Sequence, residues 1–219
     1  MRINKYVASS SQLSRRAADA AIAAGRVLVN GQAPQPGQEI TGADGVTLDG
    51  QLITPAAAAT LMLHKPPGYV VSRNGQGSST IYALLPPEYQ HLNAIGRLDK
   101  DSSGLLLLTS DGALAQELTH PSRQKAKVYQ VTLDKPLQPL HRQMISDHGI
   151  QLDDGRSQLL LERLREGNDA AWQVRMHEGR NRQIRRTFAA LGYKVRQLHR
   201  TQFGPYDLGN QPEGTYRKV

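Results

Sequence analysis

A short polar turn between two apolar segments carries the carboxylates best suited to catalysis. Residues 96–112 read G-R-L-D-K-D-S-S-G-L-L-L-L-T-S-D-G and place Arg97, Asp99 and Asp101 in this turn. A carboxylate between two buried strands is held rigidly, as a catalytic group must be. The spacing alone leaves two other interpretations open: Asp99 only caps the turn, or Asp99 and Asp101 are the paired carboxylates of a glycosidase.

Arginines near the C-terminal end form a second candidate set. Residues 180–191 are predicted to form a helix that Gly192 closes. On that helix, Arg182, Arg185 and Arg186 would share a face at spacings i, i+3 and i+4. This face is either solvated, or Arg185 turns inward while Arg182 and Arg186 meet phosphate.

The charge of the chain is strongly basic and localised. The 219 residues include 27 Lys and Arg against 19 Asp and Glu, and residues 175–219 alone hold ten basic and three acidic residues. A balance of this kind favours a nucleic-acid partner and argues against a neutral sugar substrate. A smaller basic cluster, with Asp19 as the one acid beside it, consists of Arg2, Lys5, Arg15, Arg16 and Arg26.

The composition also excludes several kinds of site. Because the chain has no Cys, disulfides, thiolate catalysis and Cys-bound zinc are excluded. The seven His residues lack the paired spacing of a metal site, so no metal is expected. The longest apolar run, 105–108, is far below the roughly 20 residues of a membrane span, and the N-terminal segment reads as an amphipathic helix. We therefore expect no membrane association and a cytoplasmic location.

The first 54 residues are predicted to form a compact helical and β module. Apolar residues at 3, 6 and 7 indicate a short helix, and Ser14 is a good N-cap for a second helix over 15–24. Strands are expected over 27–29, which ends at an Asn-Gly hairpin signal, and over 46–48. The small, uncharged segment 55–60 then predicts a linker to a second domain, 61–219.

The second domain is predicted to be rich in β-strands. A helix capped by Asp111 is expected over 112–120, in addition to the arginine-bearing helix. Strands are expected over 61–63, 69–72, 92–98, 105–109, 128–133, 158–164 and 171–176. The segments lack the rhythm of βαβ units, which indicates an α+β fold on a mostly antiparallel sheet.

Two groups of motifs resemble known families. The N-terminal R-I-N-K-Y-V, S-R-R-A-A-D and G-R-V-L-V-N-G-Q resemble the S-four-type RNA-binding module named after a small-subunit ribosomal protein. G-R-L-D followed by D-x-x-G-L-L-L-L-T-x-D-G resembles the catalytic motif of pseudouridine synthases, nearest to the branch named for the small-subunit rRNA enzyme. Four further blocks agree in order: L-H-K-P-P-G-Y-V-V-S, K-V-Y, E-G-R-N-R-Q-I-R-R, and G-P-Y-D-L-G with E-G-T-Y-R.

The resemblance implies a role for particular residues. Asp99 would be the essential catalytic carboxylate, and Arg185 the basic partner that keeps it ionised. Tyr129 would stack on the flipped uracil and help remove its C5 proton. Arg97 would hold the extruded nucleotide, and Leu198 would line the pocket. The basic residues Lys5, Arg15, Arg16, Arg26, Arg182 and Arg186 are expected to contact RNA. His64 departs from the family, which usually has Asn there.

The implied reaction is the isomerisation of uridine in ribosomal RNA, without metal or organic cofactor. The carboxylate either attacks C1′ or takes a proton from C2′, and the sequence does not choose between them. Large-subunit RNA, free or in a pre-ribosomal particle, is the expected target, and we expect a monomer without an obligate protein partner. The alternatives are a non-catalytic rRNA-binding or ribosome-assembly factor and a glycosidase-type base-excision enzyme, which would release free uracil.

Overall fold

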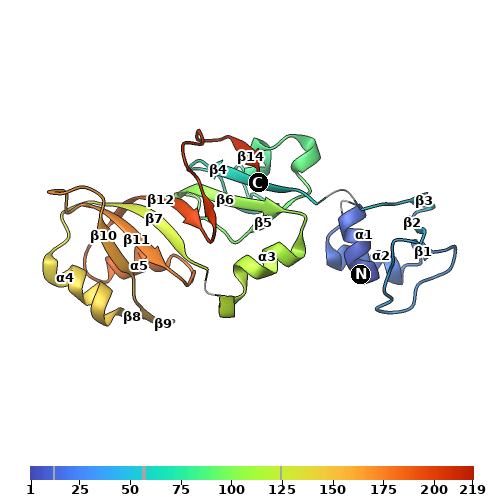
Figure 1. Ribbon diagram of the computed structural model, residues 1–219, viewed down its shortest axis with the longest axis horizontal. Helices are drawn as coiled ribbons and strands as arrows, with labels where there is room; N and C mark the ends of the chain where they lie inside the picture. The colour runs from blue at the N-terminus through green and yellow to red at the C-terminus, as the bar shows by residue number, and fades with distance from the viewer. Residues whose placement is uncertain (12, 56–57, 124) are drawn as a thin grey trace. The chain divides into compact units, whose positions relative to one another are not determined.

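The computed structural model describes residues 1–11, 13–55, 58–123 and 125–219. They divide into two compact units, Met1–Ala58 and Ala59–Val219, each with a hydrophobic core of its own (Figure 1). Of the linker expected over 55–60, residues 56–57 lie outside the described ranges, and Thr60 already begins a strand. Within the described ranges, none of the helices has the length and apolar character needed to cross a membrane.

The N-terminal unit consists of two short helices and a small antiparallel sheet. Its elements are α1 (Ile3–Ser10), α2 (Arg15–Ala23), β1 (Val27–Val29), β2 (Val46–Leu48) and β3 (Gln51–Leu52). Both expected helices and both expected strands are confirmed. Ser14 caps α2, because its side-chain oxygen accepts a hydrogen bond from the backbone N–H of Ala17 at 3.1 Å. Ile3 and Val7 of α1 are buried in the core of this unit.

Two turns with left-handed backbone conformation shape this sheet. Asp49 and Gly50, with φ of 52° and 78°, join β2 to β3. Asn30 and Gly31 also turn sharply, but the chain returns only as far as Gln32, which forms an isolated bridge with Val29. The strand that pairs with β1 is β2, after a longer connection. The Asn-Gly signal thus correctly predicted a turn. It did not mark a tight hairpin between two strands, because the partner of β1 follows only after a longer connection.

One sheet organises the larger unit. Along the sheet the strands follow the order β10-β11-β7-β12-β6-β4-β14, while β13 pairs with β12 and β5 with β6. Neighbours are antiparallel except β12 and β6, so the α+β class with a mostly antiparallel sheet is confirmed. The strands are β4 (Thr60–Lys65), β5 (Asn93–Ile95), β6 (Ser103–Thr109), β7 (Lys127–Leu133), β10 (Leu160–Arg163), β11 (Ala171–Met176), β12 (Val195–Phe203), β13 (Tyr206–Asp207) and β14 (Tyr216–Lys218).

Helices and a separate hairpin complete this unit. The hairpin consists of β8 (Ile150–Leu152) and β9 (Gly155–Ser157). The helices and single turns are α3 (Gly112–Thr119), α4 (Pro139–Gln143), α5 (Gln183–Ala189), η1 (Ile81–Leu84), η2 (Pro87–Tyr89), η3 (Pro121–Arg123) and η4 (Met144–His148). The expected cap of α3 is confirmed, since the Asp111 carboxylate accepts a hydrogen bond from the backbone N–H of Ala113 at 2.8 Å.

Two expected elements differ from the structure. The strand expected over 69–72 is absent from the described residues, where Val70 makes only an isolated bridge to Thr80. The arginine-bearing helix begins at Gln183 rather than at 180. The cause is the backbone of Arg182, whose φ of 45° is left-handed and incompatible with a right-handed helix.

The central strand β6 fixes the end of the polar turn. Its leucines alternate between two cores: Leu106 and Leu108 contribute to one, Leu105 and Leu107 to the other. Coverage on both faces explains why this strand is apolar without interruption. At its start, Gly104 pairs with Arg200 of β12, and a Cβ at position 104 would lie 2.2 Å from the backbone oxygen of Arg200. Glycine is therefore required where the turn meets β12.

Candidate active site

The turn that carries Asp99 is held from behind by backbone and side-chain hydrogen bonds. It connects β5 to β6, and the N–H of Ser102 donates to the carbonyl oxygen of Asp99 at 3.1 Å. Lys65 of β4 lies fully buried behind it, and its Nζ donates to the carbonyl oxygens of Ser102 at 2.7 Å and Pro66 at 2.9 Å. Burial lowers the pKa of Lys65 to about 8, against the opposing effect of the charges on Asp101, Asp99 and Glu213.

Two arginines from the start of α5 converge on the carboxylates of this turn. Arg182 Nη1 lies 3.3 Å from Asp99 Oδ2 and 3.3 Å from Asp101 Oδ1. Arg185 Nη2 lies 3.2 Å from Asp101 Oδ2, and its Nε is 4.0 Å from Asp99 Oδ2. The structure thus brings 99 and 185 together as expected from the sequence, but Arg182 lies nearer to Asp99.

The two arginines differ in how firmly they are held. The Arg185 side chain is 11% exposed, against 44% for Arg182. Arg185 also donates to the carbonyl oxygens of Val195 at 2.9 Å and Asp101 at 3.2 Å, so it ties β12 to the turn. Arg185 is therefore the more firmly held member of the pair.

These contacts keep the Asp101 carboxylate charged although it is partly buried. Burial alone would raise the pKa of Asp101. The hydrogen bond from Arg182 and the charges of Arg185 and Arg182 outweigh burial, so the pKa is lowered. The Asp99 side chain is 29% exposed, which leaves one side of the carboxylate open.

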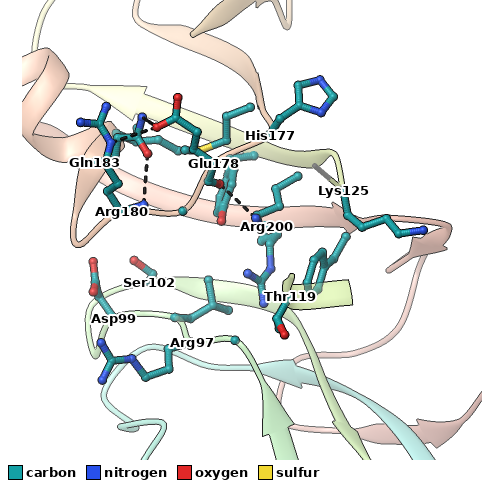
Figure 2. A pocket seen from close by; sticks show the side chains of 18 of the residues that line it. Arg97, Asp99, Ser102, Thr119, Lys125, His177, Glu178, Arg180, Gln183 and Arg200 are labelled. Carbon is teal, nitrogen blue, oxygen red and sulfur yellow. Dashed lines mark hydrogen bonds and ion pairs between the residues drawn. The ribbon is translucent and has the colours of Figure 1, made fainter. Parts of the chain in front are cut away.

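That open side faces a cavity of about 710 Å³ in the larger unit. Tyr129 of β7 and Leu198 of β12 line it as buried residues, and Arg97 lines it as an exposed one. Figure 2 shows Arg97 and Asp99 on one wall, with Arg180 and Gln183 facing them and Arg200 toward the other end. A cavity with a flat aromatic, an apolar wall and a carboxylate can accept an unstacked nucleobase.

The other basic residues chosen from the sequence have varied surroundings. Arg186 turns away to Asp154, at 2.7 Å, and does not line the cavity. In the N-terminal unit, Arg26 is paired with Asp49, and its Nε donates to Asp49 Oδ1 at 2.8 Å. Lys5, Arg15 and Arg16 are exposed on α1 and α2, and no ion pair to them is found among the described residues.

Five basic residues at the turn or in the cavity are not predicted from the sequence. Lys65 contacts the turn, and the cavity is also lined by Lys125, Lys127, Arg180 and Arg200. Lys127 lies two residues before Tyr129 in K-V-Y, and Arg200 lies two residues after Leu198 in V-R-Q-L-H-R. Alternation along a strand places residues two apart on the same face, so this spacing is the signal that indicates them. In the described parts of the chain, no group of three or more His, Cys, Asp or Glu could hold a metal ion.

Comparison with known proteins agrees with this geometry. A family model described as RNA pseudouridylate synthase matches residues 59–190, and an S4 domain model matches residues 1–46. The chain is similar to "Ribosomal small subunit pseudouridine synthase A" of Pasteurella multocida (strain Pm70), with 35% identity over 223 residues, which cover 100% of this chain and 96% of the relative.

Two further relatives have similar coverage. "Ribosomal large subunit pseudouridine synthase B" of Bacillus subtilis (strain 168) is 33% identical over 224 residues, covering 100% of this chain and 91% of the relative. A crystal structure described as a pseudouridylate synthase matches with a TM-score of 0.70 and 33% identity, covering 100% of this chain and 96% of the other. The chain therefore belongs to the RNA pseudouridylate synthase family.

Proposed function

We propose that this enzyme isomerises specific uridines of ribosomal RNA to pseudouridine, with Asp99 as the reacting carboxylate. The observation that carries the proposal is the position of Asp99. Its oxygen lies within 3.3 Å of Arg182 and 4.0 Å of Arg185, at the wall of a cavity that Tyr129 also lines. Relatives along the whole chain are named for the small-subunit and the large-subunit reaction, and both names support an rRNA substrate.

The reaction requires a base that has left the helical stack. The target nucleotide flips out at a cost of a few kcal/mol, and stacking on Tyr129 recovers part of this cost. Arg97, exposed at the cavity wall, holds the extruded nucleotide, and Leu198 supplies an apolar surface beside the base.

The isomerisation needs no reactant besides the uridine and the enzyme. The N1–C1′ bond breaks, the uracil turns, and C5 bonds to C1′. The C5 proton is then lost to a base, for which Tyr129 is the candidate, and N1 gains a proton. Asp99 begins the sequence either by attacking C1′, which forms a bond that breaks again when C5 bonds to C1′, or by taking the C2′ proton, which it returns to C2′ when C5 bonds to C1′. Both routes need an ionised carboxylate, and the two arginines stabilise that form.

The N-terminal unit is proposed to dock on RNA through Lys5, Arg15 and Arg16. Its match to the S4 domain model and the exposure of these side chains support this role. Residues 1–54 would then act as the RNA-binding module, joined by 55–60 to the catalytic domain 61–219. We further propose that the enzyme works in the cytoplasm as a monomer, on free or pre-ribosomal large-subunit RNA.

Mapping pseudouridines in rRNA tests the proposed function. Ribosomal RNA would be compared between cells with and without the gene, and between deletion strains complemented with wild type or with Asp99→Asn. We expect one or a few large-subunit pseudouridines to vanish on deletion and to return only with wild type. If every pseudouridine persists after deletion, the rRNA assignment is wrong, and rescue by Asp99→Asn would remove Asp99 from the mechanism.

A further inference from the structure

One end of the cavity contains two cations that have no carboxylate partner among the described residues. Lys127 of β7 and Arg200 of β12 come from neighbouring antiparallel strands, in which Lys127 pairs with Phe203 and Tyr129 with Arg200. Both residues line the cavity. No ion pair to either is found among the described residues within 4.0 Å.

Arg200 is a buried guanidinium with unused hydrogen-bonding capacity. The residue is 2% exposed, and its Nε donates to the carbonyl oxygen of Leu105 at 2.8 Å. Its Nη2 is buried and has no acceptor in the described part of the chain. The guanidinium lies 5.0 Å from the ring centroid of Phe203 and 6.0 Å from that of Tyr129. Aromatic faces attract a cation only weakly, and a buried charge normally has an ionic partner.

Lys127 adds a second positive charge beside it. Its Nζ donates to the carbonyl oxygen of Glu178 at 3.0 Å and lies 5.5 Å from the Phe203 ring centroid. Burial and the neighbouring charge of Arg200 lower the pKa of Lys127, while the charge of Glu178 opposes this effect. Two cations that repel one another inside a cavity create a local positive potential that an anion would relieve.

Three other cations along the same cavity, Lys125, Arg180 and Arg182, have carboxylate partners, whereas Arg97 at the Asp99 end is exposed and has no ion pair among the described residues. Lys125 Nζ lies 3.0 Å from Glu117 Oε1, and Arg180 Nη1 lies 2.8 Å from Asp154 Oδ1. Arg182 meets the two carboxylates of the polar turn. Against these pairs, no carboxylate of the described residues lies within 4.0 Å of Lys127 or Arg200, which leaves both cations available to a ligand.

We propose that Lys127 and Arg200 form an anion subsite, which binds a phosphodiester of the substrate strand next to the uridine whose base lies at Asp99. This inference rests on the proposed function, because an RNA substrate carries a phosphate on each side of every nucleotide. Charge-assisted hydrogen bonds from Lys and Arg are strong ligands for phosphate oxygens. The subsite would hold this phosphate at the end of the cavity away from the reacting carboxylate, while the base of the same nucleotide lies at Asp99.

Binding of small nucleotides to the full chain tests the subsite directly. Uridine, uridine 5′-monophosphate and uridine 3′-monophosphate would be titrated into wild type, Lys127→Met, Arg200→Lys and Lys125→Met by calorimetry or NMR. We expect wild type to bind one of the monophosphates at least about tenfold more tightly than uridine. The isomer that gains affinity identifies which flanking phosphate is bound.

The variants determine whether that gain depends on the two cations. Lys127→Met should lose most of the preference for the monophosphate and keep the affinity for uridine. Arg200→Lys keeps the positive charge but loses the planar fork of guanidinium donors, so it should lose part of the preference and keep the affinity for uridine. Lys125→Met is the matched control, because it removes a lysine of the same cavity whose charge is already paired, and it should keep the preference. Equal loss of uridine and nucleotide affinity in both variants, or no preference in wild type, would overturn the subsite. Thermal unfolding checks that each variant folds, and Lys127→Met decides alone if Arg200→Lys does not.

Failure of the subsite and failure of the proposed function are separable. The binding preference requires no turnover and no knowledge of the target uridine. A preference that depends on Lys127, together with unchanged rRNA pseudouridines after gene deletion, would keep the subsite and reject the rRNA assignment. Lost pseudouridines without any preference for phosphate would keep the function and reject the subsite.

Discussion

Two pairs of cations, one at each end of the cavity, have different kinds of partner. At the Asp99 end, Arg182 and Arg185 lie 3.2–4.0 Å from carboxylate oxygens of the turn. At the other end, Lys127 and Arg200 meet carbonyl oxygens and ring faces. Where the chain supplies the counter-charge, the cations fix a carboxylate and its ionisation. Where the described residues supply none, the charge remains available to a ligand.

Replacing the better-buried arginine of the Asp99 end should have the largest effect on this comparison. Arg185→Met removes the ion pairs to the turn and the hydrogen bond to Val195 on β12. We expect uridine isomerisation to fall at least about 100-fold, since misplacing a reacting group can cost that much. The free energy of unfolding should decrease by about 1–2 kcal/mol, because a half-exposed ion pair to Asp101 and the hydrogen bonds to Val195 and Asp101 are lost. Single-turnover kinetics and urea unfolding measure the two effects. An active, stable variant would show that Arg185 does not position the turn.

The second arginine should separate activity from stability. Arg182→Gly removes an ion pair that is half exposed, worth less than about 1 kcal/mol, and relieves a left-handed backbone that costs a non-glycine residue about 1 kcal/mol or more. The free energy of unfolding should therefore change by less than about 1 kcal/mol while the isomerisation rate falls about tenfold. A large loss of stability in urea unfolding would contradict the assignment of strain to this position.

Lys65 is a buried cation that donates to carbonyl oxygens and does not line the cavity, so its lowered pKa should appear in the stability of the protein. Its pKa is about 8 in the folded protein, against an ordinary value of 10.5, so above pH 8 the folded protein releases a proton that the unfolded chain still holds. Between about pH 8 and 10.5, stability from this group should rise with pH, by at most about 3 kcal/mol. The unfolding free energy of wild type minus that of Lys65→Met should therefore increase with pH across this window. A difference that is flat or shrinks with pH would contradict the lowered pKa.

The same comparison extends to the N-terminal unit with a smaller effect. Lys5, Arg15 and Arg16 lack acidic partners among the described residues, whereas Arg26 is paired with Asp49. Removing a cation that binds one phosphate should reduce the salt dependence of RNA binding by about 0.7–0.9 in log–log slope. We expect the triple change of Lys5, Arg15 and Arg16 to Gln to lower the slope by about 2, and Arg26→Gln to leave it unchanged. Equal effects in the two variants would show that internal pairing does not mark the RNA-contacting residues.

Local signals in the sequence predicted the frame of the site well. Ser14 and Asp111 cap helices as expected, because capping depends on a few neighbouring residues. The polar turn at Asp99 lies between strands as predicted, since a turn between apolar runs leaves few alternatives. The roles of Asp99, Tyr129 and Arg185 in catalysis remain predictions.

Local sequence signals did not predict the contacts between segments that are distant in the chain. The helical spacing places Arg182 on a face of the predicted helix, but its left-handed backbone delays the start of α5 to Gln183, and its side chain lies at the turn. Strand β12 was not expected as such, because V-R-Q-L-H-R mixes charge into its alternation. Burial of Arg200 arises from pairing with β7 and close packing on Gly104, which a local pattern does not encode. The same limit applies to Lys65 behind the turn.

The most direct test of the account compares the two carboxylates of the turn. Asp99 and Asp101 share the same pair of arginines, yet of the two only Asp99 is among the residues that line the cavity. Pseudouridine formation on an rRNA transcript would be measured under single turnover for wild type, Asp99→Asn and Asp101→Asn. We predict no product above background with Asp99→Asn and a slower but measurable reaction with Asp101→Asn. A rate for Asp99→Asn equal to or above that of Asp101→Asn would contradict the assignment of Asp99 as the reacting group.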